Sequence, residues 1–487
     1  MFKDITESPL YRIANPRSLA FFGASNNIAS MGTNQLLSVM SMGFEGKIFP
    51  VHPKEETVQG LKAYKSVLDL PETPDAAVMV LPTRVVIQSL DECGRKGIRH
   101  VIIVSGGFKE VGGEGVALQR ELVETAAKYN IRILGPNGLG VANPHHKLNT
   151  TFIPHEGNPG FIGLASQSGS FVTQMFGYLA RHGLGFSTAF SVGNEANTDI
   201  VDSLEYLGAC PHTKVIALYV EGLRRGRAFV EAAREISKRK PIVAYYIGGS
   251  ETGRKAGFSH TGAMAGPDEL YRGMFRQGGV IRAENVTELF DFCWVLGGLP
   301  RPKSNRVVIQ THSGGPGAAA ADMCGRSGLE LPALAADTVE KLAEYIPHTG
   351  SMNNPVDITF SRNPLDFYGG IPNVLLDDAN TDILLMYLLT PVTLMRRALE
   401  QMGVTKEQME EEALKMVTTQ AQALLDLVDR TDKPVVGYSW GSESEPFYKI
   451  ILDKGFPVFI GAERAAKALG AMVQYNRLRE KRPAEAV

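Results

Sequence analysis

One histidine, His260, lies in a run of small residues, GFSHTGAMAG at 257–266. A neutral imidazole is nucleophilic near pH 7, and attack on phosphorus gives a reactive phosphoramidate. The small neighbours leave room for a phosphoryl group to reach the ring nitrogen. His260 is therefore the best candidate nucleophile in the chain, although a surface or structural role is the commoner explanation for a lone histidine.

A phosphorylated histidine carries about two negative charges and needs hydrogen-bond donors in a dry site. Two segments each have the pattern of a strand followed by a Ser/Gly turn and then a helix. The first strand is 160–164, and the second is 306–310 with a helix expected from Ala318. Free backbone N–H groups at a helix N-terminus favour anions, although such turns also cap ordinary helices. The expected phosphate donors are Ser166, Ser168, Gly169 and Ser170 in the first turn, and Ser313, Gly314 and Gly315 in the second.

These turns must be held by parallel sheets, because short β-rich runs alternate with helical stretches throughout. Strands are expected at 18–22, 47–51, 76–81, 100–104 and 131–134, then at 161–164, 186–191, 215–220 and 242–247, and finally near 382–388, 434–438 and 457–460. The fold class is α/β, with a Rossmann-like first domain followed by two flavodoxin-like domains. The expected domains are 1–148, 149–302 and 303–487, the last following the turn-rich stretch 297–304.

Composition narrows the function classes. The 487 residues are 44% hydrophobic and 21% charged with a net charge of −2, which is ordinary for a globular chain and argues against a nucleic-acid binder. No apolar run reaches the roughly 20 residues that span a bilayer, and the N-terminus lacks a signal core. Single cysteines without a C-x-x-C pair predict neither a disulfide framework nor a metal site. A cytoplasmic protein is expected.

An NAD-dependent dehydrogenase is the obvious rival for a Rossmann-like first domain. The turn after the first strand, GASNNIASMG at 23–32, lacks the G-x-G-x-x-G spacing that brings a pyrophosphate onto the helix. Gly23, Ser25 and Asn26 still offer donors to an ADP-type pyrophosphate.

Seven short motifs occur in a characteristic order: FGAS at 22–25, GPNGLG at 135–140, SQSG at 166–169, SVGN at 191–194, YVEG at 219–222, SHTG at 259–262 and NPVD at 354–357. In this order they resemble the α subunit of the NDP-forming (ADP-forming) acyl-CoA synthetases, or acetate–CoA ligases, of the succinyl-CoA synthetase superfamily. The resemblance covers nearly the whole chain. Gly138 departs from the pattern, which has Cys or Ser there.

The resemblance implies that coenzyme A lies across the carboxyl ends of the first five strands. Lys54 would neutralise a phosphate, although a solvated surface lysine is the simpler explanation. For Pro82 and Pro136 the commoner explanation is that they end strands. The implied CoA-binding residues are Gly23, Ala24, Ser25, Asn26, Lys54, Leu81, Pro82, Val104, Ser105, Gly106, Pro136 and Asn137.

The implied reaction interconverts acyl-CoA, phosphate and NDP with acid, CoA and NTP through acyl phosphate and a phosphohistidine at His260. Glu221 would orient the histidine, the alternative being an exposed loop glutamate beside Arg224 and Arg225. His312 and Asp357 are interpreted as neighbours of the second turn or as structural residues.

A separate subunit is implied as well. An ATP-grasp module needs about 200 further residues, and all three expected domains are already assigned. The resemblance thus implies a β subunit that binds Mg²⁺ and ADP/ATP or GDP/GTP, in an α2β2 heterotetramer acting on a small carboxylic acid. The competing hypothesis is a non-enzymatic protein that binds CoA or acyl-CoA for regulation.

Overall fold

The computed structural model describes residues 4–155, 157–253, 266–359, 363, 365–389, 396 and 399–481. The chain divides into two compact units. Unit 1 contains the chain up to Ala180 together with Leu184–Leu289, and unit 2 contains Arg181–Gly183 and Phe290–Arg482.

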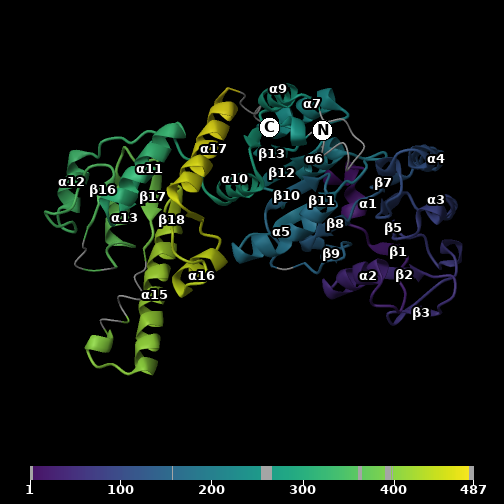
Figure 1. The fold of residues 1–487 in the computed structure, drawn as a ribbon, viewed down its shortest axis with the longest axis horizontal. Coiled ribbons are helices and arrows are strands. Elements are labelled where there is room, and N and C mark those ends of the chain that lie inside the picture. The colour runs from purple at the N-terminus through teal and green to yellow at the C-terminus, as the bar shows by residue number, and fades with distance from the viewer. Residues whose placement is uncertain are drawn as a thin grey trace. The chain divides into compact units, whose positions relative to one another are not determined.

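The first sheet of unit 1 is parallel, with the order β2-β1-β5-β6-β7. Its strands are β1 (Ser18–Phe22), β2 (Lys47–Val51), β5 (Ala76–Met79), β6 (His100–Ile103) and β7 (Arg132–Leu134), close to the expected positions. The helices between them are α2 (Met31–Ser41), α3 (Thr83–Lys96) and α4 (Glu114–Lys128). Helices α3 and α4 pack against each other, as Figure 1 shows.

The second sheet of unit 1 has the order β14-β13-β12-β10-β11-β8-β9. Its parallel strands are β10 (Ile162–Ser166), β11 (Phe186–Ser191), β12 (Val215–Val220), β13 (Ile242–Tyr246) and β14 (Ile281–Ala283). Two antiparallel strands that the sequence did not predict, β8 (Gly140–Asn143) and β9 (Leu148–Asn149), complete it. Residues 140–149 therefore pair with the second sheet. The helices are α5 (Gly169–Arg181), α6 (Ile200–Ala209), α7 (Gly226–Ile236) and α9 (Asp268–Gly278).

The two sheets of unit 1 share a hydrophobic core. One buried cluster contains Leu36 and Val39 of α2, Val78 of β5, and Leu204 and Tyr206 of α6. Hydrogen bonds reinforce this core around the short helix α1 (Tyr11–Ala14): Asn15 Nδ2 donates to Tyr206 Oη at 2.7 Å, and Asn143 Nδ2 donates to the Ala14 carbonyl at 2.9 Å. A second buried cluster fills the space between the first sheet and helices α3 and α4.

Unit 2 contains a parallel sheet with the order β16-β15-β17-β18-β19. Its strands are β15 (Val307–Thr311), β16 (Val356–Asp357), β17 (Ile383–Tyr387), β18 (Val435–Ser439) and β19 (Val458–Ile460). The helices include α11 (Gly314–Arg326), α12 (Ala336–Leu342), α13 (Gly370–Asp377), α15 (Lys406–Val428), α16 (Pro446–Asp453) and α17 (Ala462–Glu480), and α10 (Val286–Gly298) precedes the sheet. The long helix α15 is prominent in Figure 1.

Helix α11 begins four residues before the expected Ala318. Pro316 is its third residue, and proline is tolerated in a first turn because N–H groups there have no intrahelical acceptor. The α/β fold class with parallel sheets is confirmed. No helix in the described ranges is long and apolar enough to cross a membrane.

Candidate functional site

The expected CoA-binding residues follow the strands of the first sheet at one edge. Because all five strands are parallel, the segments after β1, β2, β5, β6 and β7 meet at the carboxyl edge of that sheet. Gly23, Lys54, Leu81, Val104 and Pro136 therefore share this edge. The structure brings together the segments that the sequence grouped, and Lys54 is exposed there.

The turn after β1 requires glycine. Gly23 has φ +88°, and a Cβ atom at this position would lie 1.9 Å from the Val80 carbonyl oxygen. The neighbouring donors are used inside the protein: Ser25 N–H donates to Thr33 Oγ1 at 3.0 Å, and Asn26 N–H donates to Glu55 Oε2 at 3.1 Å. The turn is thus preorganised by its own hydrogen bonds.

Ser105 connects the segments after β5 and β6. Its hydroxyl donates to the Leu81 carbonyl at 2.6 Å and accepts from Leu81 N–H at 3.0 Å. Thr83 Oγ1 donates to the Gly106 carbonyl at 2.6 Å, and Asn137 N–H donates to the Ser105 carbonyl at 2.9 Å. These bonds fix the spacing between three adjacent strand ends.

The first expected phosphate turn lies at the carboxyl edge of the second sheet, between the ends of β11 and β12. Strand β10 pairs with both, and Ser166 lies opposite Ser191 and Tyr219. The Ser166 hydroxyl donates to the Ser168 carbonyl at 2.7 Å and accepts from Ser168 N–H at 3.1 Å, so it closes the turn. Ser170, in the first turn of α5, is exposed.

Glu221 directly follows β12 and is buried, with 8% of its surface exposed. The alternative of an exposed loop glutamate does not describe this position. Burial, and then the negative charge of Glu221, raises the pKa of Tyr219 to about 12. Arg224 and Arg225 serve other groups: Arg224 donates to the Glu195 carbonyl, and Arg225 Nε donates to Asp199 Oδ2 at 2.6 Å.

Gln167 joins the expected phosphate turn to the turn that contains Glu221. Its Oε1 accepts from Glu221 N–H at 2.6 Å and from Gly222 N–H at 3.0 Å, and its Nε2 donates to the Gly222 carbonyl at 2.7 Å. The sequence motif SQSG contains Gln167, but nothing in its spacing to Glu221 reveals this contact.

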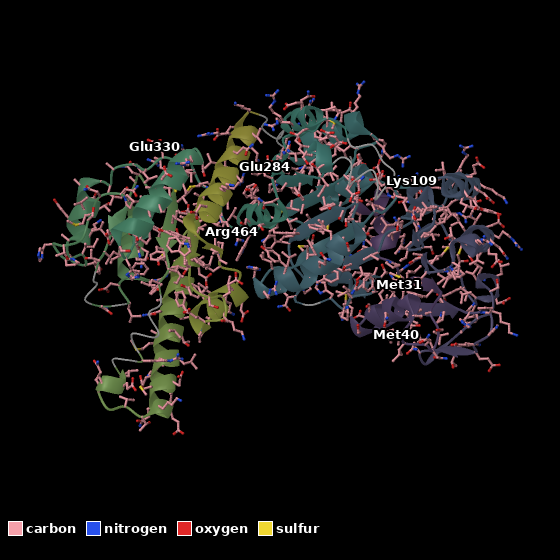
Figure 2. The ribbon with its side chains drawn as sticks, in the orientation of Figure 1. Met31, Met40, Lys109, Glu284, Glu330 and Arg464 are labelled. Atoms are coloured by element: carbon pink, nitrogen blue, oxygen red, sulfur yellow. The ribbon has the colours of Figure 1, made fainter. Side chains whose placement is uncertain are left out.

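Glu195, in the segment after β11, is a buried carboxyl group. Its carboxyl group accepts from Ile200 N–H at 3.0 Å, and the side chain of Gln167 lies close enough to lower its pKa. Burial, and then the charge of Asp199, raises the pKa of Glu195 to about 7, against the opposing effect of Lys109. Burial lowers the pKa of Lys109, whose place before α4 is labelled in Figure 2. The sequence did not single out Glu195, although it directly follows the SVGN motif.

His260 lies outside the described residues. Hydrogen bonds and a ring contact connect Tyr246 and Gly266, which flank residues 254–265 in the sequence, with the segment that follows Glu221. Tyr246, at the end of β13, donates from its hydroxyl to the Gly266 carbonyl at 2.8 Å and stacks on Tyr271 with ring centroids 3.6 Å apart. Tyr271 Oη in turn accepts from Leu223 N–H at 3.0 Å, two residues after Glu221.

The second expected phosphate turn, in unit 2, has the same internal hydrogen bonds as the first. Thr311 Oγ1 donates to the Ser313 carbonyl at 2.9 Å and accepts from Ser313 N–H at 3.2 Å, as Ser166 does for Ser168. Ser313, Gly314 and Gly315 are exposed at the start of α11. Asp357 lies beside them, because a Cβ atom on Gly314 would be 3.6 Å from Asp357 Oδ2.

His312, in the same turn, is stacked on Phe367 with ring centroids 3.6 Å apart. Burial lowers its pKa to about 4, so the ring is neutral at physiological pH. Among the described side chains, no group of three or more His, Cys, Asp or Glu residues is placed to hold a metal ion.

Three protein-family models match consecutive parts of the chain, and each part contains one of the three large sheets. A CoA binding domain matches residues 17–144, a succinyl-CoA ligase like flavodoxin domain matches 159–296, and a ligase-CoA domain matches 307–479.

Two relatives from Pyrococcus furiosus are similar over nearly their whole length. The α subunit of ADP-forming acetate–CoA ligase II is 38% identical over 94% of this chain and 96% of its own. The α subunit of isoenzyme I is also 38% identical, over 97% of this chain and 99% of its own.

A solved structure agrees with them. It is an acetyl-coenzyme A synthetase 1 from Candidatus Korarchaeum cryptofilum, described as dinucleotide forming and in complex with phosphate and ADP. It has a TM-score of 0.87 and 32% identity, with 97% of each chain covered. These relatives do not favour a purely regulatory CoA-binding protein. The chain belongs to the family of ADP-forming acyl-CoA ligase α subunits, as its ordered motifs indicated.

Proposed function

We propose that this chain is the α subunit of an NDP-forming acid–CoA ligase that uses His260 as its phosphoryl carrier. The observation that carries the proposal is the burial of Glu221 beside the 166–170 turn, with Gln167 binding both segments. A buried carboxylate at the end of a central strand can accept the imidazole N–H. It would thereby fix the tautomer and stabilise the ring as it gains positive charge.

The reaction has three reversible steps. A phosphate oxygen attacks the acyl carbonyl of acyl-CoA, and the CoA thiolate leaves, giving acyl phosphate. The imidazole nitrogen of His260 then attacks phosphorus and the carboxylate leaves. In the last step an oxygen of the terminal NDP phosphate attacks the phosphohistidine, which releases neutral histidine and NTP.

The chain supplies positioning and charge stabilisation for these steps. Coenzyme A is proposed to bind along the carboxyl edge of the first sheet, where Gly23, Ser105 and Asn137 shape the surface and Lys54 meets a phosphate. Ser168, Gly169 and Ser170 at the start of α5 are proposed as donors to a phosphoryl group. We assign Ser166 to closing this turn through its hydroxyl, and the exposed Ser313, Gly314 and Gly315 form a second candidate phosphate turn in unit 2.

The nucleotide and Mg²⁺ are assigned to a partner. The Pyrococcus furiosus relatives are named as α subunits, which implies a further subunit. We propose an ATP-grasp β subunit, an α2β2 assembly and a cytoplasmic location. The three domains 1–148, 149–302 and 303–487 remain our proposed division of this chain.

The test incubates the chain, with and without its partner subunit, with labelled phosphate and a panel of acyl-CoAs that includes acetyl-CoA. The pH is kept neutral or alkaline because phosphohistidine is acid-labile. We expect labelling of the wild type and of His212→Ala, an exposed histidine stacked on His145, and none of His260→Ala. Coenzyme A affinity should be the same in all three proteins. Full labelling of His260→Ala, or CoA binding without labelling of the wild type in the presence of the partner, would overturn the proposal.

A further inference from the structure

The side-chain amide of Gln167 both accepts and donates hydrogen bonds beside Glu221. One oxygen accepts two successive N–H groups, of Glu221 and Gly222, while the nitrogen of the same amide donates to the Gly222 carbonyl. Its own N–H donates to the Tyr219 carbonyl at 3.2 Å. A single residue thus holds the chain on both sides of Glu221.

We propose that Gln167 is a positioning residue that fixes the Glu221 carboxylate for its partner imidazole. This inference rests on the proposed function, since Glu221 is there the residue that orients His260. Gln167 itself touches no reacting atom in the proposed steps.

The orientation of the Gln167 amide is determined by its neighbours. Its oxygen must face two N–H groups, and its nitrogen must face the Gly222 carbonyl. The Glu195 carboxyl group lies close enough for the Gln167 side chain to lower its pKa. Glu195 is itself held in a backbone conformation with φ +55°, with its carboxyl group bonded to Ile200 N–H and its carbonyl bonded to Arg224. The charged groups that act on this carboxyl group are Asp199 and Lys109.

These contacts predict how substitutions behave. Gln167→Met keeps the length of the side chain but leaves the Glu221 and Gly222 N–H groups without this acceptor. Gln167→Glu keeps the acceptor but removes the donor to the Gly222 carbonyl and places a second carboxylate near Glu195. Changing Glu195 to Gln at the same time replaces that repulsion with an amide donor. The double variant Gln167→Glu/Glu195→Gln should therefore regain part of the labelling rate.

The experiment measures the initial rate of labelling from phosphate and acetyl-CoA, together with CoA affinity by calorimetry, for the complete α and β assembly. If the wild type labels from another acyl-CoA of the panel, that acyl-CoA replaces acetyl-CoA. We expect Gln167→Met and Gln167→Glu to label at least about ten-fold more slowly, with CoA affinity changed less than about two-fold. Adding Glu195→Gln should raise the labelling rate of Gln167→Glu at least about three-fold. It should not raise the labelling rate of Gln167→Met, which is the matched control for rescue.

Wild-type labelling rates in Gln167→Met, loss of CoA affinity in parallel with labelling, or no rescue of Gln167→Glu would overturn the inference. If Gln167→Met does not fold, the comparison of Gln167→Glu with the double variant Gln167→Glu/Glu195→Gln tests the inference by itself. His260→Ala is measured in the same series. Its full labelling would refute the carrier histidine, whereas unlabelled His260→Ala with normal Gln167 variants would refute only the positioning role.

Discussion

Glu195→Gln should make unit 1 more stable at alkaline pH and leave it nearly unchanged in acid. The pKa of Glu195 is raised from its usual 4.5 to about 7, chiefly by burial. The folded protein therefore binds this proton more tightly than the unfolded chain does. The resulting stability is fully present below pH 4.5 and is lost as the pH rises through 7.

The magnitude follows from the same shift. A difference of about 2.5 pH units, at about 1.4 kcal/mol each, makes folding about 3 kcal/mol less favourable at pH 8 than at pH 4.5 from this group alone. A glutamine can still accept the Ile200 N–H bond and carries no charge. The free energy of unfolding of Glu195→Gln, measured relative to that of the wild type, should thus grow by about 1.4 kcal/mol per pH unit between pH 5 and 7 and then level off.

The assay must report unit 1 separately, because unfolding of a chain with two units is not one transition. Both tryptophans, Trp294 and Trp440, belong to unit 2, so their fluorescence serves as an internal control. Hydrogen exchange of peptides from α6 and β12, followed by mass spectrometry at pH 5 to 8, measures the opening free energy of unit 1. Glu231→Gln, at an exposed site on α7, is the matched control. Parallel pH curves for the wild type and Glu195→Gln would refute the assignment of a high pKa to this carboxyl group.

Two further predictions concern the scaffold. Gly23→Ala should lower the stability of unit 1 without any ligand by more than Gly60→Ala, measured by the same exchange method. Both glycines have positive φ, which costs an alanine about 1 kcal/mol. Only at Gly23 would the new Cβ also meet a backbone oxygen at 1.9 Å. Equal losses of stability in the two variants would show that the structure around Gly23 shifts to relieve this contact. Arg306→Met should destabilise unit 2 by about 3 kcal/mol in urea unfolding followed by tryptophan fluorescence. It removes the two bonds at 2.7 and 2.9 Å from the charged partner of the buried Asp382 carboxylate and leaves it the neutral Ser304 hydroxyl as a donor. Arg326→Met, which breaks an exposed pair on α11, should cost under about 0.5 kcal/mol, and similar losses in the two variants would contradict the burial argument.

Much of the fold could be predicted from the sequence because its strands are short, apolar and flanked by turns. Strands β11 and β12 coincide with the expected 186–191 and 215–220. The antiparallel strands β8 and β9 were missed because two- to four-residue strands carry no periodicity of their own. The start of α11 was placed too late because Gly-Gly-Pro is typical of a turn, while the first helical turn tolerates it.

The candidate site was harder to predict because its polar contacts join distant segments. The positions of Gly23, Ser105 and Glu221 after their strands follow from topology alone. The role of Gln167 depends on Glu221 and Gly222, which lie 54 and 55 residues later in the chain. The burial of Glu195 depends on tertiary packing. No local pattern encodes such contacts.

The common core of the two sheets in unit 1 limits how this chain can be recombined with its relatives. A chimera cut near residue 150 would separate Asn15 from Tyr206 and strand β8 from its partner β11, and the residues that cover Leu36 and Leu204 would come from two different proteins. A cut in the turn-rich stretch 299–304 leaves that core whole. Exchange of parts to alter acid or coenzyme preference should therefore keep the whole of unit 1 together, and a transplanted CoA-binding sheet alone should yield insoluble protein.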